Sequence, residues 1–284
     1  MLTFAIKFCK MKRNILILSL IAILLSSCAN EFNAVYKSQD YDYKYEYAKE
    51  SFATGHFNRA ITLLQELVTI EKGTENAQEC LYMLGMSEYC SHDYQSASEY
   101  FKKYSSTYPK GTYAEMATFY NGESLYRSTP EARLDQTDTY SSISAYQDFL
   151  DLFPESKYHT LAQNRMFELQ DKLVQKEYLT AKLYYNLGSY FGNCTNGGNN
   201  FEASIITAQN AIKDYPYTKK REDFILLIMK SKYGLAEQSI ESKRLDRFRD
   251  AEDECYGFLN EFPDSKYKDV AEKFIAGCKK EIKD

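Results

Sequence analysis

Four stretches of the chain repeat one pattern of small and hydrophobic residues ahead of a proline. A small residue lies 12 positions before each proline, core-type residues lie 8 and 5 before it, and an aromatic residue directly precedes it. Steps of four, three and four place these positions on one helix face, and proline ends a helix because it has no N–H. The pattern therefore predicts four packed helices that end at these prolines. The four sets are Ala97, Phe101, Tyr104, Tyr108 and Pro109; Ser142, Tyr146, Phe149, Phe153 and Pro154; Ser204, Ala208, Ala211, Tyr215 and Pro216; and Ala251, Cys255, Phe258, Phe262 and Pro263.

The rest of the chain after about residue 43 is also predicted to be helical, so the expected fold class is all-α. A polar linker over 128–139 and a Gly/Asn-rich turn over 192–200 interrupt the pattern. The expected elements are helical pairs at 47–68 and 81–109, helices at 114–127 and 140–152, a long helix at 165–191, and helices at 201–215, 222–242, 247–261 and 266–282.

One of these pairs resembles a known repeat. Residues 81–109 resemble the 34-residue tetratricopeptide repeat, with Leu84, Gly85, Tyr89, Tyr94, Ala97, Phe101 and Pro109 in register. Residues 47–68 fit with Ala48 in the glycine position, although Lys72 stands where the proline is expected. Small residues there allow the two helices of a pair to touch, and such pairs must stack to bury their faces. The resemblance implies a tetratricopeptide-like solenoid of helical hairpins over 43–284, with about five repeats, a C-terminal capping helix, and halves at 43–160 and 161–284.

The N-terminus has the features of a lipoprotein signal peptide over residues 1–27. A basic stretch with Lys12 and Arg13 precedes an apolar run from Ile15 to Leu25, whose ~16 Å helical length is too short to cross a membrane. The final "LSSC" resembles the lipobox of bacterial lipoproteins, which implies cleavage before Cys28 and acylation of that residue. Residues 28–42 would then be a short tether. An ordinary secretion signal is the alternative, and the chain could start at Met1 or at Met11.

Composition narrows the function classes. A net charge of −5 and the absence of a basic stripe argue against nucleic acid as a partner. Of seven cysteines, Cys9 leaves with the signal and Cys28 is the lipidation site. The other five, Cys80, Cys90, Cys194, Cys255 and Cys278, form no C-x-x-C pair and are expected to be small buried residues for the most part.

No catalytic, metal or cofactor site is expected. His56 and His92 fall in turns between paired helices, and no H-E-x-x-H or metal-spaced His/Cys set occurs. The glycine-rich turn lacks the Lys-Ser/Thr of a P-loop. We therefore interpret the chain as a non-enzymatic protein.

Taken together, these features resemble the BamD family, the lipoprotein subunits of the bacterial outer-membrane β-barrel assembly machine. The lipobox, five tetratricopeptide-like units, the recurring aromatic-proline helix ends and the long helix "RMFELQDKLVQKEYLTAKLYYNLGSY" carry the resemblance over about 40–275. It implies a lipid anchor in the outer membrane and not the inner one, since Ala29 and not an acid follows Cys28. It further implies that the protein faces the periplasm and not the cell exterior, since no lysine-acid cluster follows the cysteine. It also implies a BamA-like barrel protein and other assembly subunits as partners, with the barrel protein contacting residues 190–210 and the helix at 222–242.

The same resemblance implies a peptide-binding groove on the first helices of the first three units. This groove would receive the C-terminal segments of unfolded outer-membrane proteins, which typically end in an aromatic residue. Aromatic side chains with a flexible methionine suit such a peptide, although core packing between repeats would use the same residues. The expected groove residues are Tyr45, Lys49, Phe52, Tyr82, Met86, Tyr89, Phe119 and Tyr126.

Two other functions remain alternatives at this point. A periplasmic tetratricopeptide lipoprotein could instead scaffold cell-wall synthesis or envelope constriction, but the long helix favours barrel assembly. An envelope-polymer hydrolase that uses its repeats for docking is disfavoured because no nucleophile and base are found together.

Overall fold

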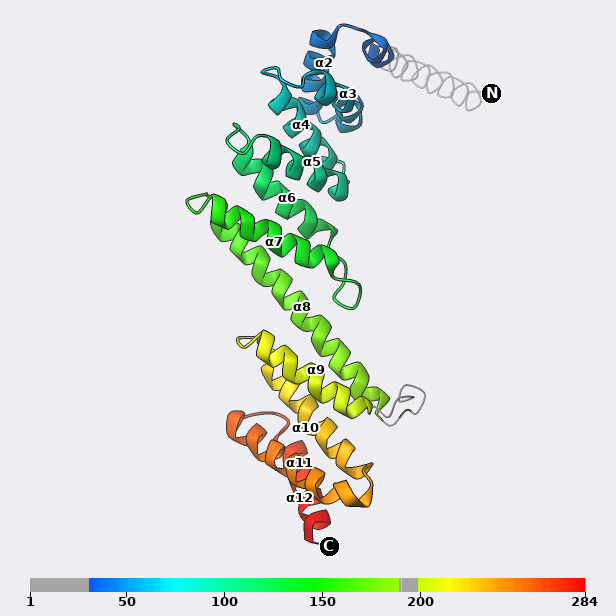
Figure 1. Ribbon diagram of the computed structural model, residues 1–284, viewed down its shortest axis with the longest axis vertical. Coiled ribbons are helices and arrows are strands. Elements are labelled where there is room, and N and C mark those ends of the chain that lie inside the picture. Colours follow the sequence, from blue (N-terminus) through cyan, green and yellow to red (C-terminus); the bar gives the residue numbers. More distant parts are fainter. Residues whose placement is uncertain (1–30, 189, 191–198, 284) are drawn as a thin grey trace, which may run out of the picture. The chain divides into compact units, whose positions relative to one another are not determined.

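The computed structural model describes residues 31–188, 190 and 199–283, and in this part of the chain all regular structure is helical (Figure 1). Cys28 and the signal peptide lie outside the described residues. The helices form five successive hairpins followed by a last helix, so the predicted all-α, tetratricopeptide-like fold class is confirmed. Their bounds are α2 Tyr41–Ala53, α3 Phe57–Ile70, α4 Ala77–Cys90, α5 Tyr94–Thr107, α6 Ala114–Ser128, α7 Thr137–Leu152, α8 His159–Leu187, α9 Asn200–Asp214, α10 Arg221–Glu237, α11 Glu241–Glu261 and α12 Lys268–Lys283.

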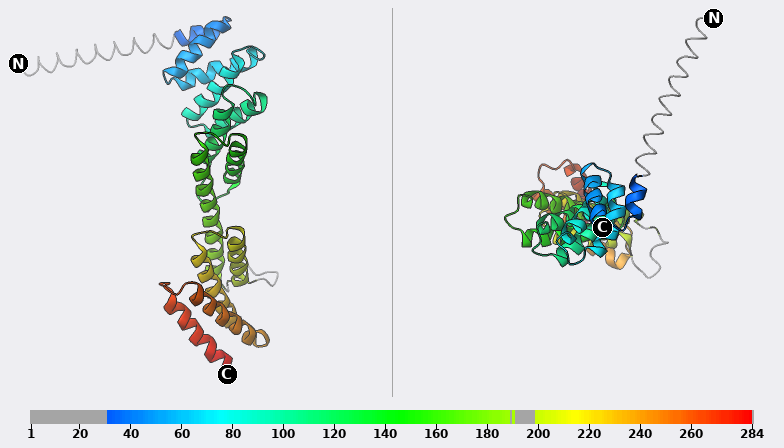
Figure 2. Two further views of the ribbon diagram at one scale, coloured as in Figure 1. Left: turned by 90° about the vertical axis from the view of Figure 1, so that its left-hand side faces the viewer. Right: turned by 90° about the horizontal axis from the view of Figure 1, so that it is seen from above.

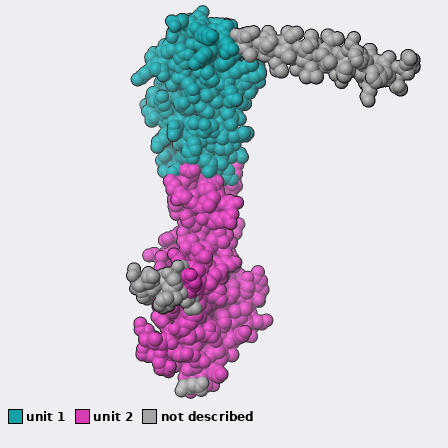
Figure 3. Space-filling view, turned by 90° about the vertical axis from the view of Figure 1, so that its right-hand side faces the viewer, with its two compact units in different colours: residues 1–128, 141–162 teal, residues 129–140, 163–284 magenta. Residues whose placement is uncertain are grey.

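The chain divides into two compact units, which are coloured separately in Figure 3. Unit 1 holds the described residues up to 128 together with 141–162, and unit 2 holds 129–140 with the residues from 163 onward. The polar linker thus belongs to unit 2, where the Nζ of Lys172 on α8 lies 2.5 Å from the hydroxyl of Thr129. Figure 2 shows the helices of both units from two further directions.

Unit 1 is built from hairpins whose helices pack in chain order, α2 on α3, α3 on α4, α4 on α5 and α5 on α6. Glycine makes two of the close approaches possible, as predicted for Gly85. A Cβ on Gly85 would lie 2.9 Å from the Phe101 ring, and one on Gly122 would lie 2.9 Å from the Tyr146 ring. In these two hairpins, a large ring of the second helix therefore packs against the position in the first helix that has no side chain.

Within unit 2 the helices also pack in chain order, α9 on α10, α10 on α11 and α11 on α12. The small residue of the repeated pattern again marks the helix crossing, because the Ser204 hydroxyl on α9 donates to the Ala181 carbonyl on α8 at 2.9 Å. The Ser231 hydroxyl on α10 donates to Ser204 at 3.0 Å. These hydrogen bonds satisfy polar groups that are fully buried where three helices meet.

The four segments in which an aromatic residue precedes a proline follow the last residues of α5, α7, α9 and α11. All twelve residues at the positions 12, 8 and 5 before the prolines are at most 2% exposed, as the pattern predicts. The aromatic residue before each proline donates its N–H to the carbonyl of the residue four positions earlier, as in Phe153 to Phe149 at 2.9 Å and Phe262 to Phe258 at 2.8 Å. That last bond closes the helix, because proline has no N–H with which to extend it.

The near-identical phrases at 153–158 and 262–267 build the same turn. In each, the serine hydroxyl donates at 2.6 Å to a glutamate in the first turn of the hairpin's first helix, Ser156 to Glu115 and Ser265 to Glu222. The same hydroxyl accepts from the backbone N–H of the following tyrosine, Tyr158 at 3.1 Å or Tyr267 at 3.0 Å. The repeated sequence therefore forms a turn that links the end of a hairpin's second helix to the start of its first helix.

Several predicted helix boundaries are wrong. Helix α7 begins at Thr137 rather than 140, because the side chain of Asp135 accepts from the Thr137 N–H at 3.0 Å and so starts the helix inside the polar linker. Helix α8 begins at His159, six residues before the predicted start. The predicted helix over 222–242 ends at Glu237, where the Ser239 hydroxyl donates to the Leu235 carbonyl at 2.6 Å, and α11 then starts at Glu241.

Part of the expected tether is structured. Residues 31–37 are helical and Val35 is fully buried in the core of the first hairpin. The Phe32 ring lies 6.4 Å from that of Tyr47, and the Arg59 guanidinium lies 5.8 Å from the centre of the Phe32 ring. Phe32 and Val35 therefore pack against α2 and α3, which leaves only residues 29 and 30 between the 31–37 helix and Cys28.

Candidate functional site

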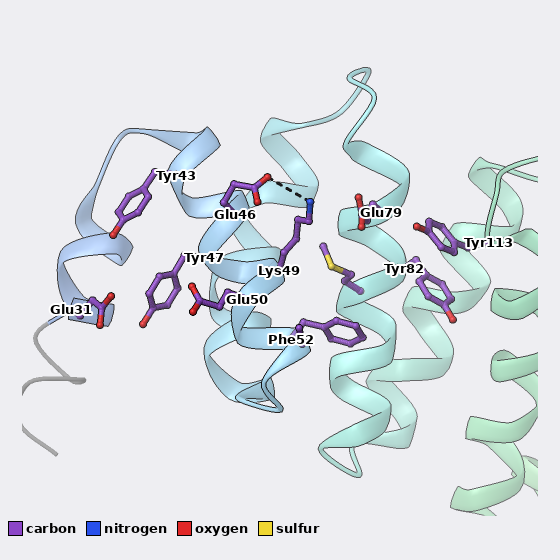
Figure 4. A pocket seen from close by; sticks show the side chains of 12 residues that line it. Glu31, Tyr43, Glu46, Tyr47, Lys49, Glu50, Phe52, Glu79, Tyr82 and Tyr113 are labelled. Atoms are coloured by element: carbon purple, nitrogen blue, oxygen red, sulfur yellow. Dashed lines mark ion pairs between the residues drawn. The ribbon is translucent and has the colours of Figure 1, made fainter. Parts of the chain in front are cut away.

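Unit 1 contains a groove between α2 and α4, with a volume of about 730 Å³. We call it the α2–α4 groove, and Figure 4 shows its lining side chains. Helix α2, α4, the residue before α6 and the start of the 31–37 helix supply them. The lining residues are Glu31, Tyr43, Glu46, Tyr47, Lys49, Glu50, Phe52, Ala53, Glu79, Tyr82, Met83 and Tyr113.

A stripe of α2 forms one wall of the groove. Tyr43, Glu46, Tyr47, Glu50 and Ala53 follow one another at spacings of three, one, three and three, so they share a helix face. Asp40 is the N-cap residue of helix α2, and its carboxylate accepts a hydrogen bond from the Tyr43 N–H at 3.0 Å. The cap fixes the first turn, and it thereby fixes the direction in which Tyr43 and the rest of the stripe project.

The opposite wall is held rigid by aromatic stacking. The rings of Tyr82 on α4 and Tyr113 lie 4.4 Å apart at an interplanar angle of 7°, and Tyr82 also contacts Phe101 and Tyr104 of α5. Burial raises the pKa of Tyr82 above its ordinary value of 10, so its hydroxyl stays protonated well into the alkaline range. This wall offers flat apolar faces with polar hydroxyl edges, a combination that suits peptide side chains.

Tyr45 and Lys49 of α2 interact with glutamates that line the groove. The buried Tyr45 hydroxyl donates to the Glu79 carboxylate, and burial together with that hydrogen bond raises the pKa of Tyr45. The Lys49 Nζ lies 3.5 Å from Glu46 Oε1 and 5.0 Å from the centre of the Tyr45 ring. Figure 4 shows the Lys49–Glu46 ion pair at the centre of the groove.

The structure brings together some of the predicted groove residues and separates others. Lys49, Phe52 and Tyr82 line the groove, with Tyr45 buried beneath it. Met86 and Tyr89 are half-buried against the core between α4, α5 and α6. Phe119 is buried against Tyr146, Phe149 and Tyr158, and Tyr126 is half-buried near the end of α6. Phe119 is therefore enclosed by its neighbours and is not among the residues that line the groove.

Sequence reasoning passed over most of the lining residues. The expected groove lies on the concave side of the first helices, which on α2 predicts the adjacent stripe with Tyr45, Lys49 and Phe52. The stripe that faces the groove has glutamate at two of its five positions, so it does not stand out by hydrophobicity. Its helical spacing of aromatic and acidic residues is the signal that could have found it.

In unit 2, the predicted contact region for a barrel subunit is only partly at the surface. Tyr190 is 61% exposed and Ile206 on α9 is 56% exposed. Most of α10, in contrast, is enclosed, with Phe224 through Met229 all buried. The outward side of α9 is therefore the more available part of that region.

No group of three or more His, Cys, Asp or Glu side chains in the described part of the chain is arranged to hold a metal ion. No described helix combines the length and apolar character that crossing a bilayer requires.

Comparison with known proteins places the chain in a family. The family model described as "YfiO: Outer membrane lipoprotein" matches residues 37–197. A protein named "Outer membrane protein assembly factor BamD" from Caulobacter vibrioides is 22% identical over 172 residues, which cover 60% of this chain and 56% of that protein. A protein of the same name from Neisseria meningitidis is 24% identical over 273 residues, which cover 90% of this chain and 94% of that protein. Because the family model covers more than half of its length, the chain belongs to the YfiO family of outer membrane lipoproteins.

Proposed function

We propose that this protein is a non-enzymatic scaffold in outer-membrane protein assembly, which receives unfolded outer-membrane proteins and docks a BamA-type barrel subunit. Family membership and the assembly-factor names of both relatives support the assembly role. The observation that carries the receptor role is the tyrosine-lined groove of about 730 Å³ in unit 1. Helical repeats commonly bind extended or helical peptides in such grooves.

The proposal includes a lipid anchor on Cys28 in the outer membrane, with the folded part facing the periplasm. Acyl chains on one residue suffice for a firm anchor, since each buried CH₂ contributes ~0.8 kcal/mol. In the Cys28→Ala variant the protein should move from the membrane fraction to the soluble periplasmic fraction. Retention of that variant in the outer membrane would contradict the anchor.

For the receptor role, we propose that Lys49, Phe52 and Tyr82 contact the peptide, with Tyr47 and Tyr113 extending the surface. All five line the same groove, and their side chains are either aromatic or long and flexible. An aromatic residue near the end of an outer-membrane protein segment would stack on Tyr82 or Phe52, a contact type that contributes ~0.5–1.5 kcal/mol beyond burial.

For the docking role, we propose the outward side of α9 with Tyr190 and Ile206. Exposed large hydrophobic side chains of this kind mark interaction surfaces when they lie close together. Purification of the acylated protein from detergent-solubilised membranes should recover a BamA-like barrel protein, identified by mass spectrometry. An Ile206→Glu variant should lose that partner, whereas Tyr217→Ala, which alters a 98% exposed side chain elsewhere in unit 2, should retain it.

The same purification separates the assembly role from the cell-wall alternative. Recovery of cell-wall synthases without a barrel protein would overturn the assembly proposal. The receptor role is tested by fluorescence anisotropy with labelled C-terminal peptides of outer-membrane proteins. Phe52→Ala should weaken their binding by about fivefold or more, and Tyr217→Ala should leave it unchanged.

A further inference from the structure

The α2–α4 groove has an excess of negative charge. Four of its lining residues are glutamates and one is a lysine. The lysine is Lys49, and its ammonium group already has the Glu46 carboxylate at 3.5 Å and the Tyr45 ring beneath it. The lining glutamates are Glu31, Glu46, Glu50 and Glu79.

Two of these carboxylates are available to a ligand. Glu79 accepts from Tyr45 and Glu46 pairs with Lys49. Glu31 and Glu50 are exposed, and their carboxylates make no hydrogen bond or ion pair with another described residue. They come from separate elements, the 31–37 helix and α2, and Figure 4 shows the Tyr47 side chain in the space between them.

Tyrosine rings accompany both carboxylates. Tyr43, Tyr47, Tyr82 and Tyr113 all line the groove, and the negative face of an aromatic ring attracts a cation at close range. Carboxylates and tyrosine rings around one hollow therefore favour a positively charged side chain and also accept an apolar or aromatic one beside it. A groove of this size takes more than one large side chain.

We infer that the α2–α4 groove selects peptide segments in which a lysine or arginine lies close to an aromatic residue, with the cation held at the end of the groove that Glu31, Glu50 and the Tyr47 ring form. The inference rests on the proposed receptor function and adds to it a charge preference of the substrate. In an extended peptide, residues two positions apart point to the same side. A basic residue two positions from an aromatic residue thus brings both side chains into the groove together.

The same charges act against a free C-terminal carboxylate in the groove. Like charges at an interface are penalised and give specificity by exclusion. The terminal carboxylate of a bound segment therefore lies outside the groove, and the preferred aromatic residue is held by its ring alone. This differs from sites that grip the terminal carboxylate itself.

The experiment uses the full folded chain after signal removal and two labelled peptides that differ in one residue. Both carry a phenylalanine, and the residue two positions before it is arginine in one peptide and glutamine in the other. Anisotropy titrations at low salt should give an arginine preference of about three- to tenfold, the size of effect that two solvent-exposed charge contacts supply. The preference should fall as salt rises, because the contacts are solvent-exposed.

A double variant assigns the preference to the groove. Glu31→Gln with Glu50→Gln should reduce binding of the arginine peptide to that of the glutamine peptide. The control is Glu99→Gln with Glu155→Gln, which makes the same charge change at exposed positions of unit 1 outside the groove and should keep the full preference. Thermal unfolding of both double variants checks that the fold is intact.

The outcomes separate this inference from the function on which it rests. Equal binding of the two peptides, or an arginine preference that survives in the Glu31/Glu50 variant, overturns the charge selection while the receptor role stands. Absence of binding by either peptide overturns the receptor role and the inference together. A preference that is lost in the Glu31/Glu50 variant and kept in the Glu99/Glu155 control supports both.

Discussion

Gly85 on α4 faces Phe101 on α5 so closely that a Cβ on the glycine would lie 2.9 Å from the ring atom Cε1. Phe101 is fully buried and contacts the rings of Tyr82 and Tyr120 as well, so the ring has no free direction in which to move. Gly122 and Tyr146 repeat the relationship in the next hairpin of unit 1. The contact between a hairpin's two helices therefore depends on the absence of a side chain at one position.

The first prediction is that Gly85→Ala destabilises the protein by about 1–3 kcal/mol, the usual range when a well-packed core is overfilled. Gly257→Ala on α11 is the matched control, since a Cβ there meets nothing within 4 Å. Alanine at an exposed helical position is favoured over glycine, so this control should be neutral or more stable by up to ~1 kcal/mol. Urea unfolding followed by circular dichroism measures both, and equal effects of the two variants would contradict the packing argument.

The repeated pattern predicted the core of four helices because it combines two independent physical signals. Helical spacing selects one face, and the proline sets the register of that face against the helix end. Ala97 and Ser204 sit at helix crossings for the same reason, and both are fully buried. The positions of these residues could therefore be predicted without any knowledge of neighbouring chain segments.

Helix starts and the candidate site could not be predicted in the same way. The start of α7 depends on the Asp135 side chain within a linker whose composition resembles any polar loop. The groove depends on which stripe of α2 remains uncovered after α3 and α4 pack against the other sides. Glu46 and Glu50 look like ordinary solvent-facing charges in the sequence, and only the tertiary arrangement shows that they line the same groove as Tyr82 and Tyr113.

The second prediction concerns Glu88, which is 6% exposed and has no ion pair among the described residues. Burial, and after it the negative charge of Asp93, raise the pKa of its carboxyl group above the ordinary value of 4.5. The folded state thus holds this proton more tightly than the unfolded state. The resulting stabilisation is present below pH 4.5 and is lost as the pH rises through the raised pKa.

At neutral pH the ionised Glu88 side chain therefore destabilises the folded state. Replacing it by the neutral glutamine in Glu88→Gln should stabilise the protein by a few tenths to about 1 kcal/mol. The gain should shrink as the pH falls towards 4. Glu99→Gln, at an exposed position of α5, should show neither effect. A Glu88→Gln variant less stable than the parent at pH 7 would mean that the carboxylate has a stabilising partner in solution.

The third prediction is an order of thiol reactivity. Burial raises the pKa of Cys80 and Cys255 to about 12 and that of Cys278 to about 11, and all three are enclosed in the core. Cys90 is only half-buried. Because the thiolate is the reactive form, brief alkylation of the folded protein at pH 8 should modify Cys90 well before the other three, as read by mass spectrometry of individual peptides.

The same thiols make the fold sensitive to alkali. Unfolded thiols lose their protons near pH 9, whereas the buried ones keep them up to about 11 or 12. The unfolding free energy should therefore fall as the pH rises from about 9. A Cys80→Ala and Cys255→Ala variant should lose part of this slope, and an unchanged slope would assign it to the tyrosines instead.

The last prediction concerns Lys44, a lysine that is 2% exposed on α2. Its ammonium group lies 2.7 Å from Glu66 Oε2, and the rings of Tyr41 and Tyr36 have their centres 5.4 and 6.0 Å away. Tyr36 belongs to the 31–37 helix, so this cation helps to hold the segment next to the proposed anchor. Glu66, in contrast, is 36% exposed at its side chain. The buried ammonium of Lys44 therefore needs its ion-pair partner more than the partly hydrated carboxylate of Glu66 does.

Removal of one partner from a buried ion pair is costly when the remaining charge cannot reach water. Glu66→Ala leaves the ammonium of Lys44 buried without its carboxylate and should cost about 2–4 kcal/mol. Lys44→Met leaves only a carboxylate that water already reaches, so its cost should be smaller, and the double variant should recover most of the loss. Urea unfolding measures the three, and hydrogen exchange of residues 31–37 should rise most in Glu66→Ala. The reverse order of the single variants would show that the carboxylate, and not the lysine, is the more dependent partner.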